Sequence, residues 1–154
     1  MNNDKMSSRV FLVVLVVFVI DTTRGSSRYR IVDFNRPISW NQARDECRRT
    51  PGWDLVKIEN RNEDQALKTF LAGECNSCGV GWFIGGQSEN GVWTWADGSQ
   101  MIYNSFLFER TSRIWIPQTV VRNFAVIFKN DLQWGYVAPR PTPQMGYICE
   151  KTTC

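Results

Sequence analysis

An apolar run lies close to the N-terminus and constrains the rest of the chain most. If it directs secretion, it sets which residues form the mature domain and exposes them to oxidising conditions. Lys5 and Arg9 precede eleven consecutive apolar residues, Val10–Ile20. This run is about half of the ~20 residues that a membrane-spanning helix requires. A basic start, a short apolar stretch and a small residue at Gly25 are typical of a secretory signal peptide. We therefore predict a signal peptide over residues 1–25, with an uncleaved signal anchor as the alternative.

The chain that this cleavage would leave, residues 26–154, carries every cysteine of the sequence. The five cysteines are Cys47, Cys75, Cys78, Cys149 and Cys154. Secretion exposes thiols to an oxidising environment, so disulfide bonds are their expected state. An odd number leaves at least one cysteine unable to pair within the chain. We expect one secreted, extracellular domain over residues 26–154, with no membrane span once the signal peptide is removed.

The charge and the residue types of the chain argue against several classes of function. The formal net charge is +3 and the basic residues are scattered, which does not suit a nucleic-acid-binding surface. The sequence has no histidine, so neither a Ser-His-Asp nor a Cys-His nucleophilic site can form. The acidic pair Glu63–Asp64 fits the first turn of a helix better than a catalytic pair. We expect a non-enzymatic protein with no cofactor and no metal.

Two helices are predicted in the first half of the mature chain. Ser39 and Gln42 form a capping box, so a helix should begin near the residue after Ser39. A second helix should begin after Asn60 or Asn62 and end at Gly73. The predicted inward face of the first helix contains Trp40, Ala43 and Cys47. The predicted inward face of the second helix contains Ala66, Leu67, Phe70 and Leu71.

Short strand patterns flank and follow these helices. The predicted strands are Tyr29–Phe34, Val80–Ile84, Val92–Ala96, Phe124–Phe128, Leu132–Val137 and Tyr147–Glu150. Gly85–Gly86 is expected to end the second of these strands, and Asn90–Gly91 predicts a hairpin turn after it. A long irregular stretch covers about residues 100–122. Helices followed by a run of short strands indicate an α+β fold.

Four sequence motifs resemble the C-type lectin-like domain family over roughly Tyr29 to Lys151. They are ISWNQARDEC in the first helix, WFIGG at 82–86, WTWADGS at 93–99 and YICEK at 147–151. Their order and approximate spacing match those of the family. The resemblance implies two helices, short antiparallel strands and a long irregular loop. It also implies a disulfide bond between Cys47 and Cys149, and core positions for Trp40, Trp82, Trp93 and Trp95.

The chain departs from this family at its second disulfide bond. Where the family has Asn-Cys-Ala, the chain has Asn123-Phe124-Ala125. The loop before YICEK, where the partner cysteine would lie, contains Pro141, Thr142 and Pro143 instead. Both cysteines are therefore missing together, and Phe124 is expected to replace the bridge with apolar packing.

Three cysteines remain outside the pattern of the family. Cys75 and Cys78 form Cys-Asn-Ser-Cys, but a zinc site would need four ligands and the chain has no histidine to add. We predict a local bridge between Cys75 and Cys78. The alternative is that Cys154 bonds one of them and leaves the other free. If Cys154 stays unpaired within the chain, it could link two copies into a disulfide-bonded homodimer or remain a free or capped thiol.

The calcium site of sugar-binding relatives has few of its ligands here. Relatives use an acidic or amide triplet in the long loop, an acidic residue before the missing cysteine, and an Asn-Asp pair after the late tryptophan. This chain has Gly135 and Tyr136 after Trp134, and Val121, Arg122 and Asn123 stand before Phe124. The triplet aligns either as Glu109-Arg110-Thr111 or as Ile116-Pro117-Gln118. Either alignment supplies at most one or two of the six to eight oxygens that calcium requires. The nearby Arg110, Arg113 and Arg122 would also repel a divalent cation.

The long loop and its neighbours form the predicted ligand surface. Tryptophan and arginine are common at binding hot spots, and they alternate with other apolar residues in this loop. The candidate ligand-binding residues are Phe108, Arg110, Arg113, Trp115, Arg122, Tyr136 and Arg140. We expect a secreted recognition protein that binds a carbohydrate or protein without calcium. The alternatives are a conventional calcium-dependent lectin and a disulfide-linked extracellular structural protein.

Overall fold

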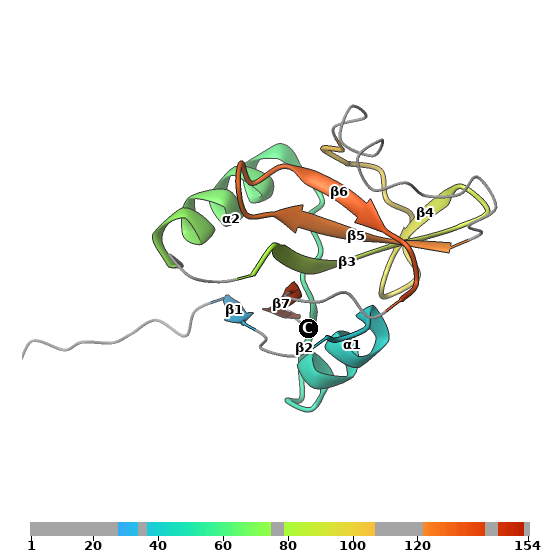
Figure 1. Cartoon of the computed structure of the whole chain (residues 1–154), viewed down its shortest axis with the longest axis horizontal. Helices are drawn as coiled ribbons and strands as arrows, with labels where there is room; N and C mark the ends of the chain where they lie inside the picture. Colours follow the sequence, from blue (N-terminus) through green and yellow to red (C-terminus); the bar gives the residue numbers. More distant parts are fainter. Residues whose placement is uncertain (1–27, 34–36, 75–78, 107–121, 141–144, 153–154) are drawn as a thin grey trace, which may run out of the picture.

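The computed structural model describes residues 28–33, 37–74, 79–106, 122–140 and 145–152. Figure 1 shows α2 above and α1 below a set of strands that run between them. The elements in chain order are β1 Tyr29–Val32, α1 Trp40–Arg48, β2 Trp53–Leu55, α2 Arg61–Glu74, β3 Gly81–Glu89, β4 Val92–Trp95, β5 Arg122–Phe128, β6 Trp134–Val137 and β7 Met145–Lys151. The predicted α+β class is thereby confirmed. Within the described residues, no helix has the length and apolar character that a membrane crossing needs.

The strands form one mixed sheet in the order β1-β7-β3-β5-β6, with β2 paired to β7 and β4 paired to β3. Most neighbours are antiparallel, as predicted. The exception is the pair of β3 with β7, which is parallel and places Gly81 opposite Met145. This pairing brings the last strand between the first strand and the middle of the sheet.

The first helix has the predicted start and the predicted inward face. The Ser39 Oγ accepts a hydrogen bond from the Gln42 backbone N–H, and the Gln42 side chain accepts one from the Ser39 backbone N–H. Trp40 is buried and donates from its indole N–H to the carbonyl oxygen of Ile84 at 2.7 Å. Its ring stacks on Phe124 with 4.9 Å between centroids. Phe124 therefore packs into the core at the position where relatives have a cysteine.

The disulfide bond between Cys47 and Cys149 joins α1 to β7, as the resemblance implied. The Cα atoms are 5.5 Å apart, and the two cysteines are 102 positions apart in sequence. Closing a loop of that length lowers the entropy of the unfolded chain, which contributes roughly 4–5 kcal/mol in the chain-entropy account. Both cysteines are fully buried, so the bond fixes the helix against the centre of the sheet.

The second helix differs from the prediction at its inward face and at its end. Asn60 caps it, because its Oδ1 accepts a hydrogen bond from the Glu63 N–H at 3.0 Å. Ala66 was predicted to face inward but is exposed, and the helix continues past Gly73 to Glu74. The buried face contains Asp64, Leu67 and Leu71, at spacings of three and four. The buried face therefore includes an acidic side chain, Asp64, and excludes Ala66.

Several strands differ from the prediction at their boundaries. β1 ends at Val32 and β4 at Trp95, β5 begins at Arg122, β7 covers Met145–Lys151, and β2 was not predicted. β3 runs through Gly85–Gly86 to Glu89 instead of ending there. A Cβ atom on Gly86 would lie 2.7 Å from the Cβ of Ala125 and 2.6 Å from the Met101 Cε, so this glycine permits close packing. β6 begins at Trp134 because Leu132 has a φ of 55°, which strand geometry does not allow. The Asn90–Gly91 turn is confirmed, with φ values of 51° and 82°.

The core lies on both faces of the sheet. The α1 face buries Trp40, Phe83, Phe124 and Tyr147 with the disulfide bond, and the α2 face buries Trp82, Trp95 and Trp134. The core positions predicted for Trp40, Trp82 and Trp95 are confirmed. Trp93 is only partly buried, at the margin of the α2-side cluster.

Candidate functional site

A pocket of about 290 Å³ lies at one end of the α2 face of the sheet. We call it the aromatic pocket. The described residues that line it are Ser88, Gly91, Trp93, Asn104, Phe106, Asn123 and Tyr136. They come from β3, the β3–β4 turn, β4, residues 104–106, β5 and β6. None of these seven side chains carries a formal charge.

The register of three strands places the polar and aromatic parts of this pocket side by side. Asn123 of β5 lies opposite Ser88 of β3, which in turn lies opposite Trp93 of β4. Residues opposite one another in paired strands have side chains on the same face. Tyr136 lies opposite Ala125, two residues along β5 from Asn123, and therefore points to that same face.

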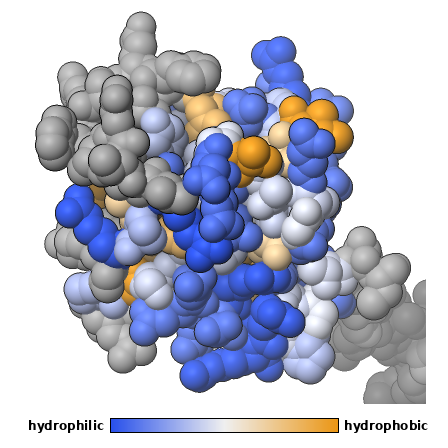
Figure 2. Space-filling model, turned by 90° about the vertical axis from the view of Figure 1, so that its right-hand side faces the viewer, coloured by the Kyte–Doolittle hydropathy of each residue, from blue (hydrophilic) through white to orange (hydrophobic). Residues whose placement is uncertain are grey.

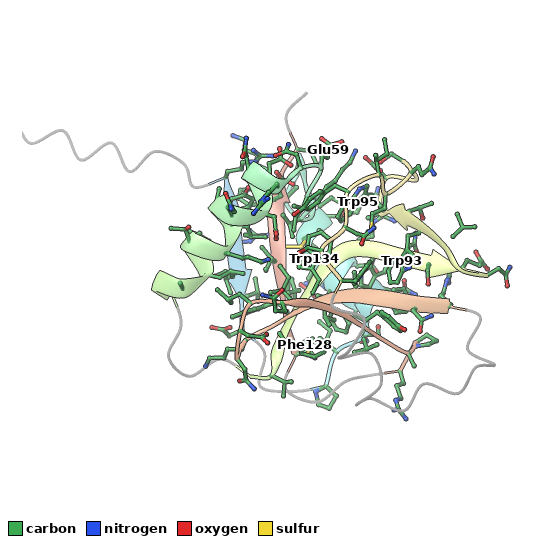
Figure 3. The ribbon with its side chains drawn as sticks, turned by 90° about the horizontal axis from the view of Figure 1, so that it is seen from above. Glu59, Trp93, Trp95, Phe128 and Trp134 are labelled. Carbon is green, nitrogen blue, oxygen red and sulfur yellow. A yellow bond between two sulfur atoms is a disulfide. The ribbon has the colours of Figure 1, made fainter. Side chains whose placement is uncertain are left out.

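The aromatic rings form a continuous cluster beside this row. Trp93 lies 4.6 Å from Phe106 and 5.9 Å from Tyr136 between ring centroids, and Phe106 lies 6.1 Å from Tyr136. Phe106 also meets the buried Trp134 edge-on at 5.7 Å. Figure 3 shows Trp93, Trp95 and Trp134 as one group beside the strands. The pocket wall is therefore an extension of the hydrophobic core.

A buried carboxylate on α2 supports this cluster from behind. Asp64 accepts hydrogen bonds from the Trp134 indole at 2.9 Å, from the Tyr103 hydroxyl at 3.1 Å and from Lys68 at 2.8 Å. Burial of the Tyr103 ring, together with the nearby charge of Asp64, raises the pKa of the Tyr103 hydroxyl. Tyr103 and Phe106 belong to one short segment, so these bonds hold that segment onto α2 and β6.

The floor of the pocket contains a polar atom without a partner. The Asn123 Nδ2 donates weakly to the buried Ser88 Oγ at 3.5 Å. Within the described part of the chain, the Asn123 Oδ1 is buried and accepts no hydrogen bond. A buried polar group in this state costs about 1–3 kcal/mol relative to a bonded one. In this orientation the oxygen is closed to a ligand, so a ligand can donate to it only if the amide turns towards the pocket.

Among the described residues, two charged neighbours of the lining residues Asn123 and Ser88 lie within ion-pair distance of each other. Arg122 precedes Asn123 on β5 and lies 3.9 Å from the Glu89 carboxylate, and both side chains are well exposed. No cluster of three or more histidine, cysteine or carboxylate groups suited to a metal occurs among the residues that the structure describes.

The predicted site residues are only partly covered by the structure. Phe108, Arg110, Arg113 and Trp115 lie outside the described residues, as do Cys75, Cys78, Cys154, the signal peptide and both alternative calcium triplets. Tyr136 lines the pocket. Arg122 precedes the lining residue Asn123 on β5 but does not line the pocket, and the alternation of side chains along a strand turns it to the opposite face. Arg140 is exposed beyond the end of β6 and does not line the pocket.

Sequence reasoning missed the remaining wall and floor of the pocket. Trp93 was assigned to the core, and Ser88, Asn104, Phe106 and Asn123 were assigned no role. A signal for Trp93 existed, since it follows the tight Asn90–Gly91 turn by only two residues, at the end of a hairpin. Nothing local distinguishes Ser88 or Asn123, because their proximity depends on strand register.

Comparison with known proteins identifies the class of this fold. Residues 36–151 match the C-type lectin domain family, and the chain belongs to that family. A sequence comparison with curated proteins gave no significant match.

Solved structures share the fold at low sequence identity. Ovocleidin-17, a major protein of the calcified layer of the Gallus gallus eggshell, is 22% identical, with 81% of this chain and 91% of that chain covered and a TM-score of 0.59. The carbohydrate-recognition domain of the human scavenger receptor C-type lectin is 19% identical, with 82% and 93% covered and a TM-score of 0.61. SPL-1 in complex with GlcNAc is 20% identical, with 79% and 85% covered and a TM-score of 0.60. These likenesses support the fold, and a C-type lectin-like recognition module is the class of protein that it defines.

Proposed function

We propose that the protein is a secreted, non-enzymatic recognition module that binds an extracellular ligand in the aromatic pocket without calcium. The observation that carries this proposal is the chemistry of the pocket lining. Among the residues that the structure describes, three aromatic rings, two amides and a hydroxyl line it, whereas a calcium site needs several carboxylate oxygens converging on one point. Aromatic walls with a few placed polar groups are the usual composition of a site for an uncharged small ligand.

The polar floor favours a ligand that carries an acetamido group. The Asn123 amide can turn either its oxygen or its nitrogen towards the pocket, because the Ser88 hydroxyl can accept or donate. An acetamido group has an N–H to donate and a carbonyl to accept, so it can pair with either arrangement. Its methyl group suits the rings of Trp93, Phe106 and Tyr136. A volume of about 290 Å³ suits one sugar ring more than an extended chain.

An N-acetylated sugar is therefore our first choice of ligand class. The complex of SPL-1 with GlcNAc shows that one protein of the same fold binds such a sugar. Calcium-dependent binding of a neutral sugar is the competing function. It is supported by the fact that one structural neighbour is a carbohydrate-recognition domain. A protein ligand would use the same aromatic wall.

A glycan array of residues 26–154, run with calcium and with EDTA, tests the proposal. We expect saturable binding to N-acetylated sugars that EDTA does not reduce, and no binding to the matching sugars with a plain hydroxyl. Binding that disappears with EDTA would contradict calcium independence. The absence of binding to any glycan on the array would overturn the assignment of a sugar ligand and would leave a protein as the ligand.

Two variants test whether the ligand binds in the aromatic pocket. Asn123→Ala removes the polar floor and Tyr136→Ala removes part of the wall, and each should weaken the sugar by about tenfold, which corresponds to one lost contact of about 1.4 kcal/mol. Thr69→Ala is the matched control, because Thr69 is an exposed residue on α2 away from the pocket lining. An unchanged dissociation constant in both pocket variants would show that the ligand binds elsewhere.

A further inference from the structure

Basic side chains gather on the α1 face of the molecule, away from the aromatic pocket. We define the basic surface as Arg30, Arg48, Arg49 and Lys151. Arg30 lies on β1, Arg48 and Arg49 are at the end of α1, and Lys151 is the last residue of β7. The lower part of the face in Figure 2, at the height of α1 in Figure 1, is covered mainly by hydrophilic side chains.

Contacts through Thr50 and Trp53 link these basic residues. The Arg30 guanidinium donates to the Thr50 hydroxyl at 3.4 Å, and Thr50 follows Arg49 in the chain. The same guanidinium lies 4.8 Å from the centroid of the Trp53 ring. Trp53 is the strand neighbour of Lys151 across β2 and β7. The basic surface is therefore continuous from β1 across the end of α1 to the end of β7.

Most of the charge on this surface is not neutralised. Arg49 lies 3.3 Å from the Glu46 carboxylate. Arg30 contacts the Thr50 hydroxyl, the Cys149 sulfur and the Trp53 ring, and its buried Nε–H donates to nothing among the described residues. Over the same described ranges, Arg48 and Lys151 form no ion pair. A partly buried guanidinium without a carboxylate is uncommon, since buried charges are normally paired.

Fold stability accounts for only part of this arrangement. Arg48 and Arg49 end α1, where positive charge offsets the partial negative charge of the helix C-terminus. That reason does not apply to Arg30 or Lys151, which lie on strands. Elsewhere, Arg28, Arg44, Lys57 and Lys68 each have a carboxylate partner.

We infer that the basic surface is a second binding site, for the sulfate groups of a linear extracellular polysaccharide. The unpaired cations lie on three separate elements, so several anionic groups along one chain can engage them, whereas one small anion cannot. Guanidinium groups suit tetrahedral oxyanions because they donate two hydrogen bonds in a fixed fork. The choice of an extracellular polymer rests on the proposed secretion. The site itself does not depend on the aromatic pocket, which opens on the α2 face.

The test measures binding of residues 26–154 to heparin as a function of salt concentration. Arg48→Gln with Lys151→Gln removes two exposed charges from the basic surface without disturbing Arg30 beside the disulfide bond. This double variant should bind heparin about three- to tenfold more weakly, as expected for the loss of two exposed ionic contacts. Its affinity should also depend less steeply on salt.

A matched control removes the same net charge elsewhere. Arg61→Gln with Lys129→Gln changes two cations on α2 and after β5 that form no ion pair with other described residues, and it should alter heparin affinity by less than about twofold. Equal losses in the two double variants would show a net-charge effect and would overturn the site. Equal binding of chemically desulfated heparin would overturn the assignment of sulfate, and failure of the wild-type chain to bind heparin would overturn the proposal altogether.

Competition separates this site from the proposed function. N-acetylglucosamine should not displace heparin, because the two ligands would bind to opposite faces of the sheet. Displacement would contradict a second site. If the array shows no sugar binding while heparin binding follows the double variants, the aromatic-pocket proposal fails and the basic surface stands.

Discussion

The Asp64 carboxylate accepts a hydrogen bond from the indole of Trp134 at 2.9 Å, although the two residues are 70 positions apart. Both are buried, and Asp64 also accepts bonds from Tyr103 and Lys68. This one side chain connects α2 to β6 and to the segment that carries Phe106. The rigidity of the aromatic pocket thus depends on a residue that does not line it.

Replacement of Asp64 by alanine should lower the free energy of unfolding by about 2–4 kcal/mol, because it leaves the buried Trp134 indole without an acceptor and removes the bonds from the partly exposed Tyr103 and Lys68. Chemical denaturation followed by tryptophan fluorescence measures the loss. Asp45→Ala is the control, since Asp45 is an exposed residue on α1 and its loss should change stability by less than about 0.5 kcal/mol. A similar effect of both substitutions would contradict the role of the buried network.

The disulfide bond between Cys47 and Cys149 should be worth about 2–5 kcal/mol. The double variant with both cysteines changed to alanine tests this, because it keeps the buried site apolar. Its unfolding midpoint in urea should fall well below that of the wild type under oxidising conditions. Equal midpoints would show that the covalent link contributes little.

Burial raises the pKa of Glu150 above its ordinary value of 4.5, although hydrogen bonds from the Lys57 N–H and from Arg28 act against the shift. The folded state therefore keeps a proton on Glu150 at pH values where the unfolded chain has released it. The contribution of Glu150 to stability is fully present below pH 4.5 and is lost as the pH rises through the higher folded pKa.

Glu150→Gln cannot titrate at this position, so its stability relative to the wild type should increase as the pH rises from about 4.5 towards neutrality. Urea denaturation of both proteins at a series of pH values gives this difference. A difference that decreases over the same range would mean that the ion pair with Arg28 outweighs the cost of burial.

Close packing at Gly86 predicts a cost for even one added methyl group. The Gly86→Ala variant would bring its Cβ within 2.7 Å of the Ala125 Cβ, between two central strands. We expect a loss of about 1–3 kcal/mol in unfolding free energy. Gly98→Ala provides a contrast, because nothing lies within 4 Å of that position and any cost there comes from its φ of 87°. An effect at Gly98 alone would contradict the packing argument.

Local signals predicted where both helices begin, and the resemblance to the family predicted one disulfide bond; the predicted Cys75–Cys78 bridge lies outside the described residues. The capping box at Ser39 and Gln42 fixed the start of α1, and the pairing of Cys47 with Cys149 followed from the resemblance. These features depend on residues a few positions apart or on a motif shared with the family, so one sequence suffices to predict them.

The aromatic pocket could not be predicted in the same way. Ser88 and Asn123 are 35 positions apart and meet only because β3 and β5 pair in a particular register. Hydrophobic periodicity shows which side of a strand is apolar but not which residue of another strand lies opposite. Asp64 was missed for a related reason, since its partner Trp134 is supplied by the tertiary fold and makes an acidic residue acceptable at a buried position.

Isothermal titration calorimetry of residues 26–154 with N-acetylglucosamine, in calcium and in EDTA, tests the central claim most directly. The aromatic pocket predicts the same dissociation constant in both buffers and no comparable heat with glucose. Binding that requires calcium would contradict the account, because it would mean that carboxylate and metal, not the aromatic rings and the Asn123 amide, hold the ligand.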